Sequence, residues 1–92
     1  MSVPEPRFTM KFMDMGMERV TAAQAFLRKT IMDGEQNPRT LAQSLKHKFD
    51  QDYGPTWHCI VGNSFGSMVS HCENGFLYFY VDNQAILLFK SS

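Results

Sequence analysis

The chain has 92 residues, and its nine lysines and arginines balance nine aspartates and glutamates, so the formal net charge is zero with neutral histidines. Balanced charge excludes the one-signed field that attracts nucleic acid or an anionic membrane, and it permits close self-association. No apolar run approaches the roughly 20 residues that a membrane span requires. This length predicts a single domain with a thin core.

The cysteines and the first residues bear on the compartment. Cys59 and Cys72 are too few for a disulfide framework, and residues 1–6 lack the basic and then apolar build of a signal peptide. We therefore expect a soluble protein of the reducing cytoplasm. Residues 1–7 contain two prolines and no packing pattern. They are expected to form a flexible N-terminal arm, and residues 8–92 a single domain.

The first expected elements are a short strand and a helix. Residues 8–12 alternate, which predicts an edge strand with Phe8, Met10 and Phe12 on one side. Asp14 is expected to cap the helix that follows. An apolar stripe then predicts about four helical turns. The stripe consists of Val20, Ala23, Leu27 and Ile31, and Gly34 is expected to end the helix.

A second helix is expected to begin at Asn37 and Pro38, because asparagine is a good N-cap and proline suits the first helical position. Its apolar ridge, at four-residue spacing, consists of Leu41, Leu45 and Phe49. Gly54 and Pro55 end it. The short link between the helices predicts a helical hairpin packed on one face of a sheet.

The second half of the chain, residues 53–90, predicts an antiparallel sheet. Its strand-forming runs are separated by turn compositions, at residues 62–63, 73–75 and 82–84. In the strand that begins at Phe76, this residue shares one face with Tyr78 and Tyr80, and the opposite, apolar face is expected to pack on the helices. The tyrosine face is left for another protein surface. The predicted class is α+β.

Residues 65–71 form an unusual strand, because a glycine and two serines interrupt its apolar side chains. Such a strand packs poorly on its own and is easily approached by another backbone. It suits an edge that receives a partner strand through main-chain hydrogen bonds.

Two His-Cys pairs, His58 with Cys59 and His71 with Cys72, suggest a metal or thiol site. Neighbours on a strand point to opposite faces, so neither pair readily aims both side chains at one ion, and no C-x-x-C spacing is present. We expect no enzyme, no metal and no cofactor. The alternative is a small metal- or thiol-dependent enzyme that uses these four residues.

Several stretches in the last half of the chain resemble the eight-kilodalton dynein light chain family. In order, they are YGPTWHCIVG from Tyr53, FGS from Phe65, FLYFY from Phe76 and AILLFKS from Ala85. The first half resembles the family in layout alone. The resemblance implies a non-enzymatic dynein light chain and a strand-exchanged homodimer, in which residues 65–72 complete the partner's sheet.

The resemblance also implies two identical grooves. These bind short, otherwise disordered motifs of dynein intermediate chain and other clients as an added strand, and they promote client dimerisation. The implied peptide-binding residues are Phe65, Gly66, Ser67, Met68, Val69, Ser70, His71, Phe76, Tyr78 and Tyr80, together with Arg39, where the family has a lysine. The implied dimer-interface residues are His58, Phe65, Ser67, Met68, Ser70 and Ser91.

Two interface residues carry further implications. Charging of His58 in acid is expected to oppose association, and Ser91 matches a family serine proposed as a phosphorylation site. Met68 stands where the family has a tyrosine, and Ser70 where it has a threonine. We therefore expect a different motif preference and dimer strength. The expected location is the cytoplasm and the dynein complex of the cytoskeleton, with a ciliary axoneme left open. A motor-independent adaptor or inhibitor would use the same groove.

Overall fold

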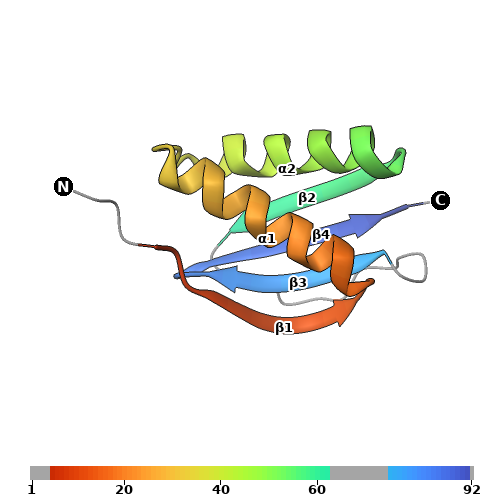
Figure 1. Cartoon of the computed structure of the whole chain (residues 1–92), viewed down its shortest axis with the longest axis horizontal. Coiled ribbons are helices and arrows are strands. Elements are labelled where there is room, and N and C mark those ends of the chain that lie inside the picture. Colours follow the sequence, from red (N-terminus) through yellow and green to blue (C-terminus); the bar gives the residue numbers. More distant parts are fainter. Residues whose placement is uncertain (1–4, 63–74, 92) are drawn as a thin grey trace.

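Two helices lie on one face of a four-stranded antiparallel sheet in the computed structural model, which describes residues 5–62 and 75–91 (Figure 1). The elements are β1 (Phe8–Asp14), α1 (Met17–Met32), α2 (Pro38–Tyr53), β2 (Trp57–Gly62), β3 (Phe76–Val81) and β4 (Gln84–Lys90). The strand order is β1-β3-β4-β2, and neighbouring strands are antiparallel. The predicted α+β class is confirmed.

Helix α1 buries the predicted stripe. Val20, Ala23 and Leu27 are buried against the sheet, as the three- and four-residue spacing requires. The predicted start of the helix is wrong. Asp14 is the last residue of β1, and the helix begins after Gly16, which makes no side-chain cap.

The turn after α1 is a Schellman motif. The Gly34 N–H donates to the Ile31 carbonyl at 2.9 Å, and the Glu35 N–H donates to the Thr30 carbonyl at 3.2 Å. Gly34 has a φ of 108°, a conformation that side-chain-bearing residues rarely adopt. The predicted glycine end of α1 is therefore confirmed, and α2 follows after a short link.

Helix α2 has the predicted bounds. The Asn37 side chain accepts a hydrogen bond from the Arg39 N–H at 2.9 Å, and Pro38 takes the first helical position. Gly54, with a φ of 81°, follows the last residue. The ridge of α2 is fully buried: Leu41, Leu45 and Phe49.

Strand β1 contains an irregularity that the sequence did not predict. Met10 pairs with Phe79, but the register then shifts, and Phe12 lies opposite Tyr78. This bulge turns Phe12 to the face that carries Tyr78 and Tyr80. There its ring packs edge-on against the ring of Phe76, with the two ring centroids 5.3 Å apart. The expectation that Phe12 shares a side with Phe8 and Met10 is therefore wrong.

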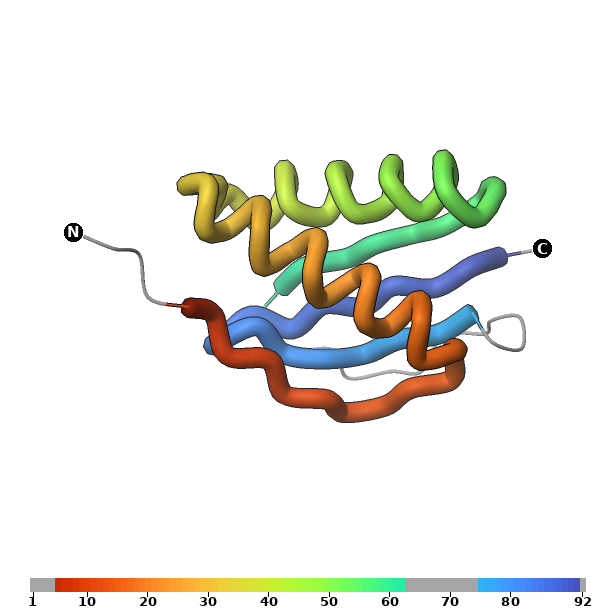
Figure 2. Tube along the Cα trace, in the orientation of Figure 1, coloured from red at the N-terminus to blue at the C-terminus, as the bar shows by residue number. Residues whose placement is uncertain are grey.

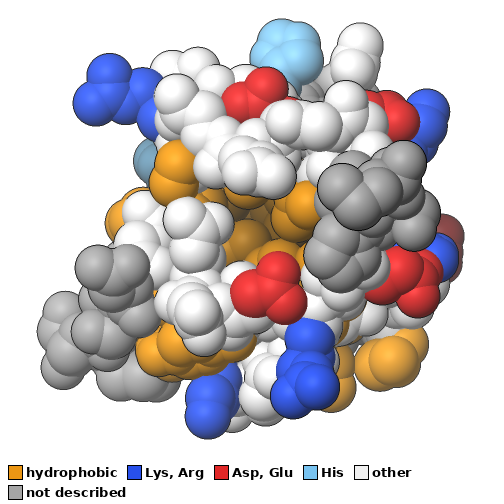
Figure 3. Space-filling view, turned by 90° about the vertical axis from the view of Figure 1, so that its left-hand side faces the viewer, with side chains coloured by type: hydrophobic (Ala, Val, Ile, Leu, Met, Phe, Trp, Pro, Cys, Tyr) orange, Lys and Arg blue, Asp and Glu red, His pale blue; other side chains and the backbone are white. Residues whose placement is uncertain are grey.

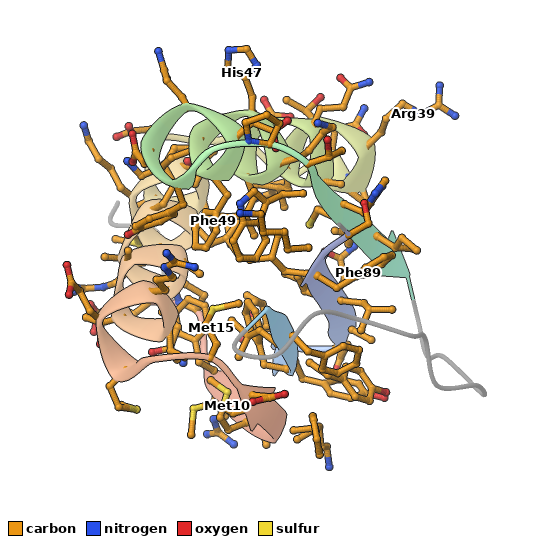
Figure 4. All side chains as sticks on the ribbon, turned by 90° about the vertical axis from the view of Figure 1, so that its right-hand side faces the viewer. Met10, Met15, Arg39, His47, Phe49 and Phe89 are labelled. Atoms are coloured by element: carbon orange, nitrogen blue, oxygen red, sulfur yellow. The ribbon has the colours of Figure 1, made fainter. Side chains whose placement is uncertain are left out.

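The core lies between the helices and the inner face of the sheet. Figure 4 shows Phe49 and Met15 pointing into this space, whereas His47 and Arg39 point away from it. The buried sheet residues of the core cluster are Trp57, Leu77, Phe79, Val81, Ile86 and Leu88. Neither helix that the structure describes has the length and apolar character needed to cross a membrane.

Residues 5–7, the first that the structure describes, make defined contacts with the rest of the domain. Glu5 forms an ion pair with Arg28 of α1, and Pro6 is buried. The Arg7 N–H donates to Asp82 Oδ1 at 3.0 Å, while the Asp82 N–H donates to the Arg7 carbonyl at 2.8 Å. Figure 2 shows the start of the described chain beside the β3–β4 turn. The bonds between Arg7 and Asp82 join the residues just before β1 to that turn.

Candidate functional site

The edge of β2 is the first part of the candidate site. One side of β2 pairs with β4 along its whole length, and no described strand pairs with its other side. A hollow of about 600 Å³ lies beside this edge, between β2 and the start of α2. Its lining is Asn37, Pro38, Arg39, Ala42, Cys59, Ile60 and Val61. An open edge beside a hollow is suited to an added strand, which gains main-chain hydrogen bonds there.

The outer face of the sheet is the second part. The register places Phe76, Tyr78 and Tyr80 on the face that points away from the helices, as their alternation predicted. Across β4 and β2, this face continues through Ala85, Leu87, Phe89, His58 and Ile60. Ile60 is 44% exposed. The face is therefore largely apolar across β3, β4 and β2.

The two tyrosines interact with each other. Their ring centroids are 6.0 Å apart, and a hydrogen bond with Tyr78 raises the pKa of Tyr80 above its ordinary value. The Lys11 ammonium lies 5.4 Å from the centre of the Tyr80 ring, in a cation–π arrangement. The tyrosine face thus has polar groups among its rings, a composition enriched at protein interfaces.

One protomer does not bring all the predicted groove residues together. Arg39 is exposed beside β2, whereas Tyr78 and Tyr80 lie on β3, and β4 stands between the two strands. The remaining predicted groove residues lie outside the described part of the chain: Phe65, Gly66, Ser67, Met68, Val69, Ser70 and His71.

His58 and Ser91, predicted together at the dimer interface, are neighbours although 33 positions separate them. His58 Nε2 lies 2.9 Å from Ser91 Oγ, and the Ser91 N–H donates to the Thr56 carbonyl at 3.0 Å. The imidazole also stacks on the ring of Phe89, with centroids 5.0 Å apart. These contacts fix the imidazole at one end of the outer face.

Cys59 points to the opposite face from His58 and packs against the core cluster. Burial raises the pKa of its thiol to about 12, so the thiol is protonated at neutral pH and is a poor nucleophile. Within residues 5–62 and 75–91, no group of three or more histidine, cysteine, aspartate or glutamate side chains is placed to hold a metal ion. His71 and Cys72 lie outside these ranges.

Asp50 supports the start of β2, a role that sequence reasoning missed. Its Oδ1 accepts the Trp57 N–H at 2.7 Å, and its Oδ2 bonds the Lys46 ammonium. The Lys46 hydrogen bond, and then that of the Trp57 backbone, hold the pKa of Asp50 below its usual value. The four-residue spacing of Lys46 and Asp50 was the signal available in the sequence.

Two helices on one sheet face, an open edge strand and an apolar outer face define a small α+β domain suited to association through its sheet. The model of the family "dynein light chain type 1" matches residues 7–91. The chain therefore belongs to the dynein light chain family, as the sequence motifs indicated.

A dynein light chain of Schistosoma mansoni is 55% identical over 53 residues, which are 58% of this chain and 60% of the relative's length. The fold has similar solved structures. The dynein light chain-like domain of the Fasciola hepatica calcium binding protein FhCaBP2 has a TM-score of 0.80 at 19% identity, over 95% of this chain and 93% of that chain.

A second solved structure is the dynein light chain-like domain of CsTAL3. It has a TM-score of 0.74 at 21% identity, over 100% of this chain and 99% of that chain. At these identities, the two structures support the fold alone.

Proposed function

We propose that this protein is a homodimeric, non-enzymatic hub that binds short motifs of dynein intermediate chain and other disordered clients by β-strand addition. The observation that carries the proposal is the open edge of β2 beside the hollow at the start of α2. Family membership supports binding to dynein components and the homodimer that is typical of the family.

In this proposal, residues 65–72 of a second copy pair with the open edge of β2. The separation of Arg39 from the tyrosine face supports a groove built by two copies. Arg39 comes from one copy, and residues 65–71 with the tyrosines come from the other. The client backbone adds to the exchanged strand, and its side chains fill alternate pockets. His58 and Ser91 lie at the dimer interface.

Two grooves in one dimer make the second motif of a paired client bind intramolecularly. At effective concentrations in the millimolar range, avidity rises by about 10² to 10⁴ over a single groove. Modest affinity in each groove is then sufficient. By this mechanism, the protein promotes dimerisation of its clients.

Calorimetry with two client peptides tests the proposal. One peptide carries a single motif, and the other is a coiled-coil dimer that presents two copies. We expect the paired client to bind about 10² to 10⁴ times more tightly. Equal affinities would contradict the hub mechanism.

A pull-down from cell extract identifies the clients. Phe65→Ala and Tyr78→Ala should each reduce capture of dynein intermediate chain, because both residues are assigned to the groove. Met17→Ala is the matched control, since Met17 is 63% exposed on α1. Equal loss with Met17→Ala would show that the loss is not specific to the assigned residues, in contradiction to the groove assignment.

The same pull-down separates the remaining functions. We propose a location at dynein in the cytoplasm, with the axonemal dynein of cilia as the alternative. Capture of clients without any dynein subunit would indicate a motor-independent adaptor.

A separate metal analysis tests the alternative of an enzyme. Stoichiometric zinc in protein purified without chelators would favour the metal-dependent enzyme.

A further inference from the structure

A second hollow opens at the end of the molecule where the α1–α2 link faces the β3–β4 turn. Its volume is about 360 Å³, and its lining includes Ile31, Leu41 and Val81. Leu41 and Val81 are buried, so they form the floor. Figure 3, which faces this end of the molecule, shows hydrophobic side chains at the base of a depression. The volume lies within the range of about 300 to 1,000 Å³ that is typical of small-molecule sites.

The rim of this hollow is acidic. Glu35 and Asp82 contribute carboxylates, and three side-chain amides complete the lining. Among the described residues that line it, none is a lysine, arginine or histidine. The rim therefore favours a cationic group over an anionic one.

Both carboxylates are held in place by backbone groups. Glu35 Oε1 accepts the Asn37 N–H at 3.2 Å, and Asp82 Oδ1 accepts the Arg7 N–H at 3.0 Å. Each bond uses one oxygen of its carboxylate, and the other oxygen can accept from a ligand. The turns that carry the two residues are themselves fixed, by the Schellman motif after α1 and by the bonds between Arg7 and Asp82. The acidic rim is therefore preformed.

We propose that this hollow binds a small organic amine. The apolar body of the ligand would lie on Leu41 and Val81, and its ammonium group would donate to Glu35 and Asp82. Burial of apolar surface and charge-assisted hydrogen bonds then act together. This hollow and the hollow beside β2 share no lining residue, although Gln36 of one lining precedes Asn37 of the other in the chain.

Three probes of similar shape test the charge preference: 2-phenylethylamine, 2-phenylethanol and 3-phenylpropanoate. They are titrated into the full chain, labelled with ¹⁵N, and followed by amide chemical shifts. We expect the amine to perturb Ile31, Leu41 and residues 81–84, with an affinity about fivefold to tenfold above that of the alcohol. The carboxylate should bind most weakly. Equal affinities for the three probes, or shifts elsewhere, would overturn the proposal.

The double variant Glu35→Gln, Asp82→Asn removes both charges and keeps an oxygen for each backbone donor. Asparagine also tolerates the φ of 53° at position 82. Amine affinity should fall about fivefold to tenfold, to that of the alcohol, and alcohol affinity should stay within twofold. Glu18→Gln, on the first turn of α1, is the matched control and should change neither. An unchanged amine affinity in the double variant would refute the acidic rim.

A third variant and a further probe locate the apolar floor. Ile31→Trp should fill the hollow from a half-buried helix position and weaken both the amine and the alcohol at least tenfold. Full binding of both probes by Ile31→Trp would place the site elsewhere.

Nα-acetyl-lysine amide, which keeps the ammonium group of the lysine side chain, is the further probe. If it shifts the same peaks and 2-phenylethylamine does not, the occupant is a protein side chain, and the small-amine proposal fails. Motif-peptide binding, measured in parallel, reports separately on the proposed function.

Discussion

The two faces of the sheet carry similar apolar residues, but these residues have different packing partners. On the inner face, Leu77, Phe79 and Leu88 pack against the ridges of both helices. On the outer face, Phe76 and Leu87 are also buried, yet neither belongs to that core cluster. We therefore infer that the two faces differ in function. The inner face folds the protomer, and the outer face, with the edge of β2, is proposed to join it to other chains.

The largest expected effect is on the inner face. Phe79→Ala should lower the free energy of unfolding by about 3 to 5 kcal/mol, because it leaves a cavity in a fully buried part of the core. Chemical denaturation of the protomer, under conditions that suppress association, measures the loss. Tyr78→Ala, one position away on the other face, is the comparison variant. An equal loss for the two variants would contradict this difference between the faces.

A charge on the outer face comes next. His58→Lys should give a monomer that binds motif peptide poorly, because the lysine charge must be desolvated at the proposed interface. Sedimentation velocity and peptide calorimetry measure the two effects. His47→Lys is the matched control, since His47 is exposed on α2 and points away from the sheet (Figure 4). A dimer of normal strength in His58→Lys would exclude this residue from the interface.

A smaller effect concerns the helix that borders the open edge. Asn37→Ala removes the acceptor of the Arg39 N–H and should cost about 1 kcal/mol of unfolding free energy. Asn37→Ser retains a capping oxygen and is the control, with a loss of a few tenths of a kcal/mol. Urea denaturation compares them. Equal losses for alanine and serine would show that capping has no part in the effect.

The smallest expected effect is that of replacing Asp50, whose side chain on α2 accepts a hydrogen bond from the first residue of β2. Because its pKa is lowered in the fold, its stabilisation is fully present above the unfolded pKa near 3.9 and is lost as the pH falls through the folded value. Asp50→Asn should cost about 0.2 to 1 kcal/mol at pH 7 and reduce the loss of stability in acid. Denaturation from pH 6 to pH 2 measures both. An unchanged acid slope in the variant would contradict this role.

Local signals in the sequence predicted the elements well. The ridge of α2, the caps at Asn37 and Gly34 and the alternation of β3 all follow from neighbours within a few positions, and the structure confirms them. The predicted start of α1 was wrong, because β1 continues to Asp14. The bulge that turns Phe12 outward was also missed, since pairing with β3 decides it.

The candidate site was less predictable. Family motifs indicated the tyrosine face and Arg39, but spacing alone could not show that they lie apart in one protomer. The bonds between Arg7 and Asp82 join residues 75 positions apart, so a local sequence pattern could not predict them. The acidic hollow likewise joins two separate turns. Such features depend on the assembled fold.

The central claim is that the open sheet edge and the outer face join two copies of this chain. The most direct test is the mass of the wild-type protein in solution, measured by sedimentation equilibrium at pH 7 over a range of micromolar concentrations. The account predicts twice the chain mass of 10.6 kDa. A mass of 10.6 kDa throughout that range, in protein that still binds motif peptide, would contradict it.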